Sequence, residues 1–354
     1  MRKHILLPLI ALAMATPVSA HPYFIRLGYS SCTACHISPQ GGGILTPYGG
    51  GVERALSLFQ EPEQGERKSP PLSYDMRALV VGSSTEGVPA SSFQLLSLSS
   101  LKISAHQRLT STISLTSPTL TAQGGRGAAA VDVPILIWQF QPADGFELMV
   151  GRDTLPTGLG SPDPATFIRF GTDPGSAAYP TQVKAFWRST RWQVTPYAFG
   201  PAGNEDSAAR KWGSGVLGGV VLGNQRAVIG VSADEARGST FDRGSVGAYA
   251  RLGFGKWALL LEHEVAARTT SVTTNVIVGH TRAVYVPWGW LETWVSAEEL
   301  ITYAPTSAHV IRVAPGMQAR FSRNMLLGFT SRDVFTSKGQ SRIYTGTLTL
   351  RSAN

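Results

Sequence analysis

The sequence predicts an all-β fold, an antiparallel outer-membrane β-barrel of about 14 to 16 strands. Three observations support this prediction. Short segments of alternating apolar and polar residues recur from residue 73 onward, 38 glycines and 22 prolines favour turns over long helices, and only 15% of residues are charged. Soluble globular domains usually carry about a quarter charged residues, and a mean hydropathy of +0.01 means that apolar residues are dispersed along the chain.

Residues 1–20 are typical of a secretory signal peptide. Arg2 and Lys3 follow the initial methionine, an apolar run extends from residue 5 to residue 15, and a Val-Ser-Ala sequence typical of a cleavage site ends at Ala20. The run is too short to cross a bilayer, which takes about 20 apolar residues. We therefore expect cleavage after Ala20 and export of the rest of the chain.

Residues 21–60 contain the one motif that indicates a defined chemistry. The only two cysteines, Cys32 and Cys35, stand in a C-T-A-C-H run that ends with His36. In an exported protein this run indicates a c-type haem attachment site. Each thiol can form a thioether with the porphyrin, and the adjacent histidine then reaches the iron as an axial ligand. The spacing predicts one covalent haem c on Cys32 and Cys35, with His36 as the metal ligand and no catalytic residue.

Other interpretations of this motif stay open. A structural disulfide would not need His36, a thioredoxin-type redox pair would require a surrounding βαβ pattern, and a zinc site would need further ligands. The second axial ligand is open as well, because a methionine would raise the reduction potential and an open position would permit ligand binding. Candidates outside the signal peptide are Met76, Met149, Met317, Met325, His21, His106, His263, His280 and His309.

The segment around the motif is too small to fold around a large core of its own. Glycines at 41–43 permit a close wrap of the backbone against a flat ligand, and the apolar residues between 52 and 59 follow helical spacing. Residues 61–72 are rich in Glu, Lys and Pro and indicate a linker. We expect residues 21–60 to form a monohaem cytochrome segment that needs the haem and a surrounding wall.

Residues 73–354 form the predicted barrel. Residues 183–188 and 191–196 alternate on both sides of Ser189-Thr190, which predicts a hairpin. We count about sixteen such segments between residues 74 and 350, most with the roughly 9 to 11 residues of a tilted transmembrane strand. Tryptophans at strand ends favour an interfacial girdle; they are Trp187, Trp192, Trp288, Trp290 and Trp294.

Two features of this region leave alternatives. Alternation alone also fits a soluble β-sandwich, although the strand count and the low charge favour a barrel. The stretch 154–180 is the longest connection, and it either folds into the lumen, lies over the mouth or forms an external loop.

The N-terminal residues resemble the fused monohaem cytochrome-porins of iron-oxidising and other electron-exchanging bacteria. The resemblance covers residues 21 to about 60, and the barrel matches in architecture only. It departs from that family's pattern by the three glycines at 41–43 and by Gly50 in place of a basic residue. The matching stretches are Pro22-Tyr23-Phe24-Ile25-Arg26, the C-T-A-C-H run, Pro39 and Leu45-Thr46-Pro47-Tyr48-Gly49.

The resemblance implies a cytochrome segment that plugs or caps the pore and passes electrons across the bacterial outer membrane, in its most concrete version from extracellular Fe(II). Because one porphyrin is much smaller than a hydrocarbon layer of about 30 Å, we expect redox partners on both sides. One partner is a periplasmic cytochrome or other redox carrier, and the other is an extracellular electron donor or acceptor. The barrel also contacts outer-membrane lipid, and we expect no nucleic-acid partner. The alternatives are a passive porin whose haem segment serves assembly or gating, and a haem-based small-molecule sensor.

Overall fold

The computed structural model describes residues 22–38, 44–59, 71–85, 88–121, 124–126, 128–159, 179–201, 211–239, 241–270, 272–303, 307–322, 324–337 and 339–351. The predicted signal peptide, the glycines at 41–43 and most of the predicted linker, residues 61–70, lie outside these ranges.

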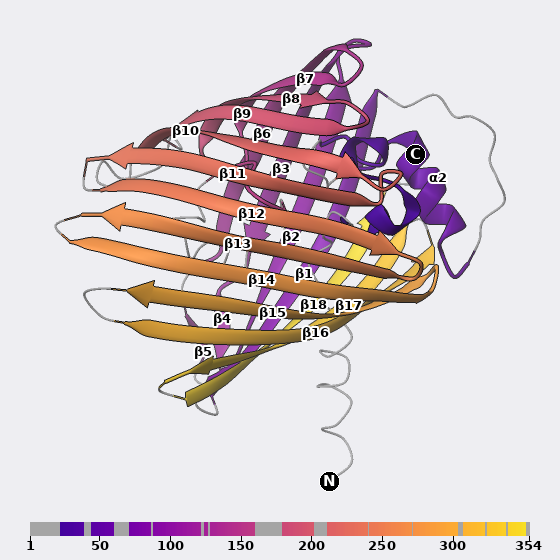
Figure 1. The fold of residues 1–354 in the computed structure, drawn as a ribbon. Coiled ribbons are helices and arrows are strands. Elements are labelled where there is room, and N and C mark those ends of the chain that lie inside the picture. The colour runs from indigo at the N-terminus through magenta and orange to yellow at the C-terminus, as the bar shows by residue number, and fades with distance from the viewer. Residues whose placement is uncertain are drawn as a thin grey trace, which may run out of the picture.

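The strands join into one antiparallel sheet that closes on itself (Figure 1). Closure occurs where β1 pairs with both β2 and β18, with Met76 opposite Leu350 on one side and Ser97 on the other. Closure removes the unpaired strand edges that an open sheet would expose. The described strands are β1 (Leu72–Thr85), β2 (Val88–Lys102), β3 (Gln107–Thr116), β4 (Thr119–Thr121), β5 (Gly124–Arg126), β6 (Ala130–Ala143), β7 (Phe146–Arg152), β8 (Thr181–Arg188), β9 (Trp192–Gly200), β10 (Lys211–Leu222), β11 (Ala227–Gly238), β12 (Asp242–Phe254), β13 (Trp257–Thr269), β14 (Thr273–Trp288), β15 (Leu291–Tyr303), β16 (Ala308–Ser322), β17 (Met325–Thr336) and β18 (Gly339–Arg351).

Sixteen of these 18 strands form the closed wall. The other two, β4 and β5, form a small hairpin on the connection between β3 and β6, which pair directly with each other. Each segment predicted from alternation falls on one wall strand, and the hairpin at Ser189-Thr190 joins β8 to β9. The predicted barrel is therefore confirmed, whereas the β4–β5 hairpin was not predicted.

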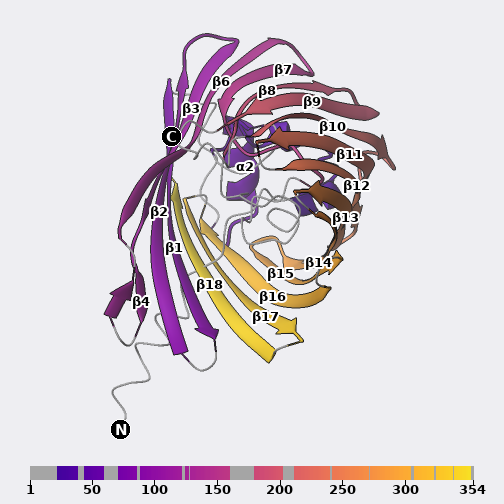
Figure 2. The same cartoon turned by 90° about the vertical axis from the view of Figure 1, so that its left-hand side faces the viewer.

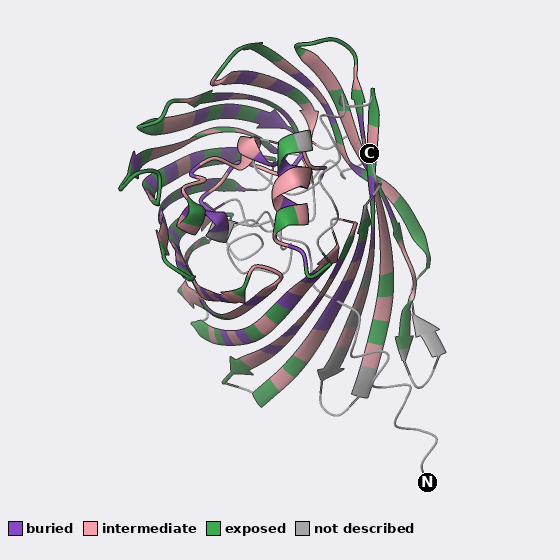
Figure 3. Cartoon of the chain, turned by 90° about the vertical axis from the view of Figure 1, so that its right-hand side faces the viewer, coloured by how far each residue is buried: buried purple, intermediate pink, exposed green. Residues whose placement is uncertain are grey.

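The two faces of the wall differ in the way a membrane barrel requires. On β12, Arg243, Ser245 and Arg251 are buried on the inner face, while Val246 between them is 63% exposed on the outer face. Figure 3 shows this alternation of buried and exposed positions along the strands. A polar interior and an apolar exterior suit a bilayer, and a sandwich would need the reverse. Other exposed apolar residues on wall strands include Val216, Ile229, Val231, Val265 and Val295.

The two mouths of the barrel differ in their connections. At one mouth, which we call the short-turn mouth, two to four residues join consecutive strands, as at 144–145 between β6 and β7 and at 255–256 between β12 and β13. At the opposite mouth the connections include residues 153–180 and 201–210. Outer-membrane barrels have short periplasmic turns and longer extracellular loops, so the short-turn mouth is assigned to the periplasm.

Aromatic residues gather on the outer face at the short-turn mouth. Trp187 packs edge-on against Trp192 across the β8–β9 turn, and Trp288 stacks on Trp290 at the β14–β15 turn. This agrees with the predicted girdle for these four residues. The prediction was wrong for Trp294, which alternates in phase with the buried inner residues of β15 and packs against apolar residues inside the barrel.

The N-terminal segment lies inside the ring of strands at the short-turn mouth (Figures 2 and 3). It consists of the 3-10 turns η1 (Pro22–Leu27) and η2 (Cys32–Ala34) and the helix α2 (Pro47–Ala55). No helix in the described part of the chain is long and apolar enough to cross a bilayer.

The long connection after β7 turns into the lumen at its start. The backbone N–H of Leu159 donates to Glu262 Oε2 on the wall at 3.0 Å, and Arg251 Nη2 donates to the carbonyl of Leu159 at 3.0 Å. Leu159 is buried in the same apolar cluster as Phe24 and Ile25 of η1. Of the three predicted placements, the lumen is therefore correct for residues 154–159, and residues 160–178 lie outside the described chain.

Candidate functional site

The cysteine motif forms one compact turn. Ser31 caps η2 by accepting from the N–H of Thr33 at 3.4 Å, and the N–H groups of Cys35 and His36 both donate to the carbonyl of Cys32, at 3.2 and 2.9 Å. Local hydrogen bonds therefore hold Cys32, Cys35 and His36 on one turn. These are the three residues that the sequence assigns to haem attachment.

Residues 44–49 hold this turn from the other side. The N–H of Thr46 donates to the carbonyl of Cys35 at 2.9 Å, and its hydroxyl donates to the carbonyl of Ala34 at 3.0 Å. His36 and Leu45 form an isolated antiparallel bridge. These bonds hold the backbone on both sides of Cys35.

Helix α2 begins where this contact is made. Thr46 is its N-cap and accepts from the N–H of Gly49 at 3.0 Å, and Pro47 follows at the first helical position, where a missing N–H does no harm. A Cβ at Gly49 would overlap the carbonyl of Cys35. The absence of a side chain at Gly49 therefore permits direct contact between the helix and the motif.

Two tyrosines connect the parts of the N-terminal segment. The hydroxyls of Tyr29 and Tyr48 share a hydrogen bond, and the rings meet edge to face. This hydrogen bond, aided by partial burial, raises the pKa of Tyr29 to about 12. The contact ties the residues before η2 to helix α2.

The thiols are not joined to each other. Both cysteines are free, Cys32 is partly exposed and Cys35 is buried. Burial raises the pKa of the Cys35 thiol, and proximity to Cys32 adds to the rise. Among the described residues, no group of three or more His, Cys, Asp or Glu has a metal-binding arrangement.

The barrel wall anchors the segment through apolar contacts. Phe24 and Ile25 of η1 are 7% and 1% exposed, and they pack with wall residues in one cluster. A Cβ at Gly253 of β12 would overlap the backbone of Ile25 and Arg26. Burial of two such side chains stabilises the docked segment by roughly 1.5 to 3 kcal/mol each. The wall side of this cluster comprises Val221, Val228, Tyr249, Ala258, Leu260, Val284 and Val286.

One buried arginine anchors the far end of the segment. Arg320 of β16 is fully buried and lies 3.7 Å from Glu53 of α2 and 2.6 Å from Glu292 of the wall. Its guanidinium also lies over the ring of Phe24, 5.7 Å from the centroid. The carbonyl of Arg320 accepts from the N–H of Leu58 at 2.8 Å. A buried charge is tolerated where it is paired in this way.

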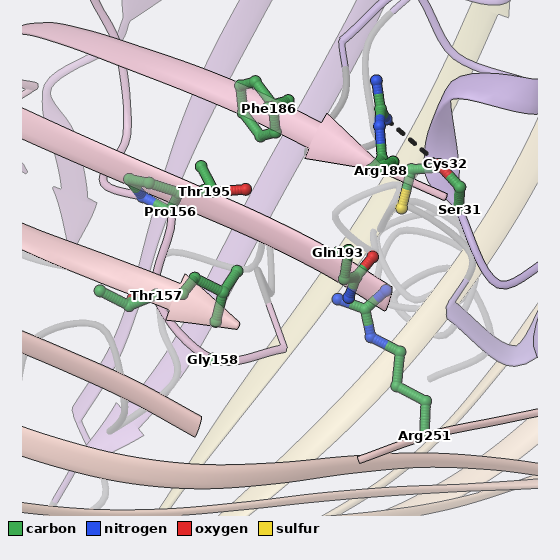
Figure 4. Close-up of a pocket in the computed structure, with 11 residues that line it drawn as sticks. Ser31, Cys32, Pro156, Thr157, Gly158, Phe186, Arg188, Gln193, Thr195 and Arg251 are labelled. Carbon is green, nitrogen blue, oxygen red and sulfur yellow. Dashed lines mark hydrogen bonds between the residues drawn. The ribbon is translucent and has the colours of Figure 1, made fainter. Parts of the chain in front are cut away.

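A second arginine connects the motif itself to the wall. Arg188 Nη1, at the end of β8, donates to the hydroxyls of Ser31 and Thr33 at 3.1 and 3.0 Å. Its other nitrogen lies 3.6 Å from Glu147 Oε2. Figure 4 shows Arg188 beside Cys32, whose sulfur points between the side chains of Arg188 and Gln193. The motif turn is therefore positioned against β8 by hydrogen bonds to a charged donor.

Cavities lie on both sides of the motif turn. The larger has a volume of about 590 Å³, and His36, Thr33 and Ala34 line it together with turns of the short-turn mouth. A smaller cavity of about 40 Å³ lies beside Cys32, between Phe186, Leu217 and Arg251 (Figure 4). Binding sites for small organic ligands usually have about 300 to 1,000 Å³, which makes the larger cavity a candidate site.

The donor set of the motif suits a c-type haem, because Cys32 and Cys35 are unbridged on a single turn and His36 follows directly. His36 lines the larger cavity, Cys32 lines the smaller one and Cys35 lines neither. Arg108 and Arg188 also line the larger cavity, and cations suit the carboxylates that a haem carries. Sequence reasoning singled out the three motif residues but missed the contacts of Gly253, Arg188 and Arg320, because their partners lie far away in the chain.

The comparisons with known proteins concern the barrel. No family model and no curated protein matches the chain. Among solved structures, OmpT of Vibrio cholerae matches at 10% identity over 82% of this chain and 100% of that chain, with a TM-score of 0.60. An anion-selective porin of Comamonas acidovorans matches at 10% identity over 79% of this chain and 98% of that chain, with a TM-score of 0.58.

A further solved structure agrees with these two. OmpF of Salmonella typhi, in complex with daunomycin, matches at 11% identity over 79% of this chain and 97% of that chain, with a TM-score of 0.55. Matches at such low identity establish the fold. Together with the apolar outer face, they show that this chain is a bacterial outer-membrane β-barrel protein.

Proposed function

We propose that this protein transfers electrons at the outer membrane through one covalent c-type haem on Cys32, Cys35 and His36. The main support is the C-T-A-C-H turn itself, which places two free thiols and a histidine together and packs against α2 at the short-turn mouth. Thr33, Ala34 and His36 of this turn line a cavity of about 590 Å³. When bound, the haem supplies a reversible Fe(III)/Fe(II) couple.

The chain's own residues have distinct tasks in this proposal. Cys32 and Cys35 would hold the haem covalently, so that it would not be lost to the periplasm, and His36 would bind its iron. Cys35 and His36 are both buried. Arg188 positions the turn through Ser31 and Thr33.

The position of the site determines which partners can reach it. A periplasmic redox carrier approaches the short-turn mouth directly. The hydrocarbon layer is about 30 Å thick, so that an extracellular partner has to reach the site through the lumen. The lumen favours a small solute over a protein, and aqueous Fe(II) is the donor that suits this route best.

The experiment uses purified, haem-loaded protein in liposomes that enclose oxidised cytochrome c and an Fe(II) chelator. Fe(II) is added outside, and reduction of the enclosed cytochrome is followed by absorbance. We expect reduction with the haem-loaded protein and none with the Cys32→Ala/Cys35→Ala double variant, which keeps the barrel. The chelator captures Fe(II) that merely permeates. Equal rates for both proteins, or a negative haem stain after denaturation, would contradict the proposal.

The second candidate is a passive porin in which the N-terminal segment serves assembly or gating. The comparisons favour this candidate, because the matched barrels include an anion-selective porin. In the same liposomes it predicts leakage of an enclosed solute at equal rates with and without haem, and no reduction of the enclosed cytochrome. The two readouts therefore separate the candidates.

A further inference from the structure

The rim of the short-turn mouth carries a row of basic side chains, which we call the basic arc. Three consecutive hairpin turns each present one exposed cation: Arg191 in the β8–β9 turn, Arg226 in the β10–β11 turn and Lys256 in the β12–β13 turn. None of these three turns contains an acidic residue. This part of the rim is therefore positively charged.

The basic arc is continuous because strands β8 to β13 are neighbours in the sheet. Figure 1 shows these strands side by side. Neighbouring strands lie about 4.8 Å apart, so that consecutive hairpin turns are roughly 10 Å apart and the three cations span roughly 20 Å. This span fits within the contact surface of one small protein, which is about 800 Å² per partner in a standard complex.

Main-chain hydrogen bonds hold the basic arc in place. The carbonyl oxygens of Arg191, Arg226 and Lys256 each accept from an N–H of the next strand along the wall, at 2.8, 2.8 and 2.9 Å. The donors are Val221, Gly253 and Val286. The three cations therefore start from backbone that belongs to the sheet, and their spacing is set by the barrel.

The basic arc lacks the acidic partners that lumen arginines have. Arg320 of the lumen lies 2.6 Å from Glu292. No carboxylate in the described part of the chain forms an ion pair with a residue of the basic arc, and Lys256 Nζ donates to the carbonyl of Pro287 at 2.8 Å. Of the described turns at this mouth, only the β6–β7 turn carries an acid, Asp144. The charges of the arc are therefore available to a partner from outside.

The basic arc borders the turn that carries the cysteine motif. Ser30 Oγ, two residues before the motif, donates at 3.2 Å to Oε1 of Gln225, the neighbour of Arg226. Residues 189–190 of the first arc turn line the same cavity as His36. A protein seated on the arc would therefore lie against the segment that the proposed haem function assigns to electron transfer.

Exposed apolar side chains of the N-terminal segment extend this surface. Leu27 at the end of η1 is 41% exposed, and Tyr48 of α2 is 54% exposed. Figure 3 looks onto this mouth and shows exposed positions on α2. Because the segment lies inside the ring of strands, these side chains do not meet the lipid around the wall. Protein interfaces combine apolar and polar groups in this way, which favours a protein partner over lipid headgroups.

We propose that the basic arc, together with the exposed part of the N-terminal segment, is the docking surface for an acidic, water-soluble redox protein of the periplasm. The proposal rests on the proposed haem function, because the partner exchanges electrons with this chain only if the haem is present. Complementary charge raises association rates by about 10- to 1,000-fold, and transient redox complexes commonly bury less than about 1,200 Å². Charge steering suits a carrier that has to bind and leave quickly.

The test uses full-length, haem-loaded protein in phosphatidylcholine nanodiscs, which leave both mouths open to solution. The probes are native cytochrome c, which is basic, and the same protein after succinylation of its lysines, which makes it acidic. We expect the succinylated form to bind more tightly than the native form at about 0.01 M salt. This preference should weaken toward about 0.1 M salt, where the screening length falls from about 30 Å to about 10 Å.

Arg226→Glu and Arg237→Glu are a matched pair of variants. They make the same change in charge next to opposite ends of strand β11, and the Arg237 side chain is 77% exposed at the other mouth. We expect Arg226→Glu to weaken binding of succinylated cytochrome c and Arg237→Glu to leave it unchanged. The triple variant Arg191→Glu/Arg226→Glu/Lys256→Glu should bind it at least about tenfold more weakly and should prefer native cytochrome c.

The outcomes separate the docking surface from the function beneath it. Equal affinity for the two cytochromes, or unchanged affinity of the triple variant, would overturn the docking surface and leave the haem function intact. A negative haem stain of the wild type would overturn both. Heat-modifiable mobility in SDS gels checks that each variant forms the barrel, and Arg226→Glu provides the decision if the triple variant does not fold.

A lipid role of the basic arc gives a different result. Native mass spectrometry of protein from mixed phosphatidylcholine and phosphatidylglycerol nanodiscs measures the anionic lipid that stays bound. If the triple variant loses this lipid but keeps its affinity for succinylated cytochrome c, the arc binds headgroups and the proposal is overturned.

Discussion

At the scale of single residues, the candidate site depends on a position that lacks a side chain. Gly49 of α2 lies directly on the main chain of Cys35, and a Cβ there would overlap it. At the same contact, Thr46 donates hydrogen bonds to the carbonyls of Ala34 and Cys35. The motif turn therefore packs on α2 at the position where Gly49 has no side chain.

We predict that Gly49→Ala loosens the N-terminal segment without affecting the barrel. Overpacking of this kind typically costs about 1 to 3 kcal/mol, and here it separates α2 from the motif turn. Limited proteolysis should cleave the variant within residues 44–59 faster than the wild type.

The matched control for this prediction is Gly50→Ala on the same helix. A Cβ at Gly50 meets nothing within 4 Å, and alanine is favoured over glycine in a helix by about 1 kcal/mol. Gly50→Ala should therefore resist proteolysis at least as well as the wild type. Equal cleavage of the two variants would show that the Gly49 contact does not hold the segment.

The same residues show what the sequence reveals about a site. Cys32, Cys35 and His36 could be identified because their spacing is local and each residue type has a specific chemical role. The contact of Arg320 with Glu53 joins residues far apart in the chain, and it depends on the register of the strands and on where the segment docks. No local pattern encodes such a contact, so that it became visible only in the folded chain.

At the scale of elements, the docking of η1 on β12 closes part of the short-turn mouth. Gly253 permits the backbone of Ile25 and Arg26 to lie against the strand. We predict that Gly253→Val displaces η1 and raises the conductance of the barrel in planar bilayers, because valine occupies the space that this backbone fills.

Gly244→Val on the same strand is the control for this change. Gly244 faces outward and a Cβ there meets nothing within 4 Å. The conductance of the Gly244→Val variant should therefore equal that of the wild type. Should Gly253→Val also conduct like the wild type, η1 would not restrict the pore.

The elements themselves were predictable to different degrees. The wall strands were found because each is long enough to show alternation, and a bilayer demands an apolar outer face over its whole thickness. The strands β4 and β5 have three residues each, too few for a period of two to appear. Trp294 was misplaced because a shift of one residue reverses the face of a strand, and its neighbours Trp288 and Trp290 sit at the turn.

At the scale of the whole molecule, the barrel is asymmetric and the candidate site lies at one end. The motif, α2 and the rim residue His106 all lie at the short-turn mouth, whereas the connection 153–180 belongs to the opposite mouth. The proposed route for electrons requires the short-turn mouth to face the periplasm. This sidedness follows from turn length, and it can be measured independently of the haem.

We predict that an epitope tag inserted between Gly255 and Lys256, in the β12–β13 turn, is inaccessible to antibody on intact cells and becomes accessible after the outer membrane is permeabilised. A tag inserted after Thr270, in the β13–β14 connection at the other mouth, should be labelled on intact cells. The two insertions flank one strand, β13, so that they differ in side of the membrane and in little else. Labelling of the first tag and not the second on intact cells would place the cysteine motif outside the cell. A periplasmic carrier would then have to reach it through the lumen, and the extracellular donor could be of any size.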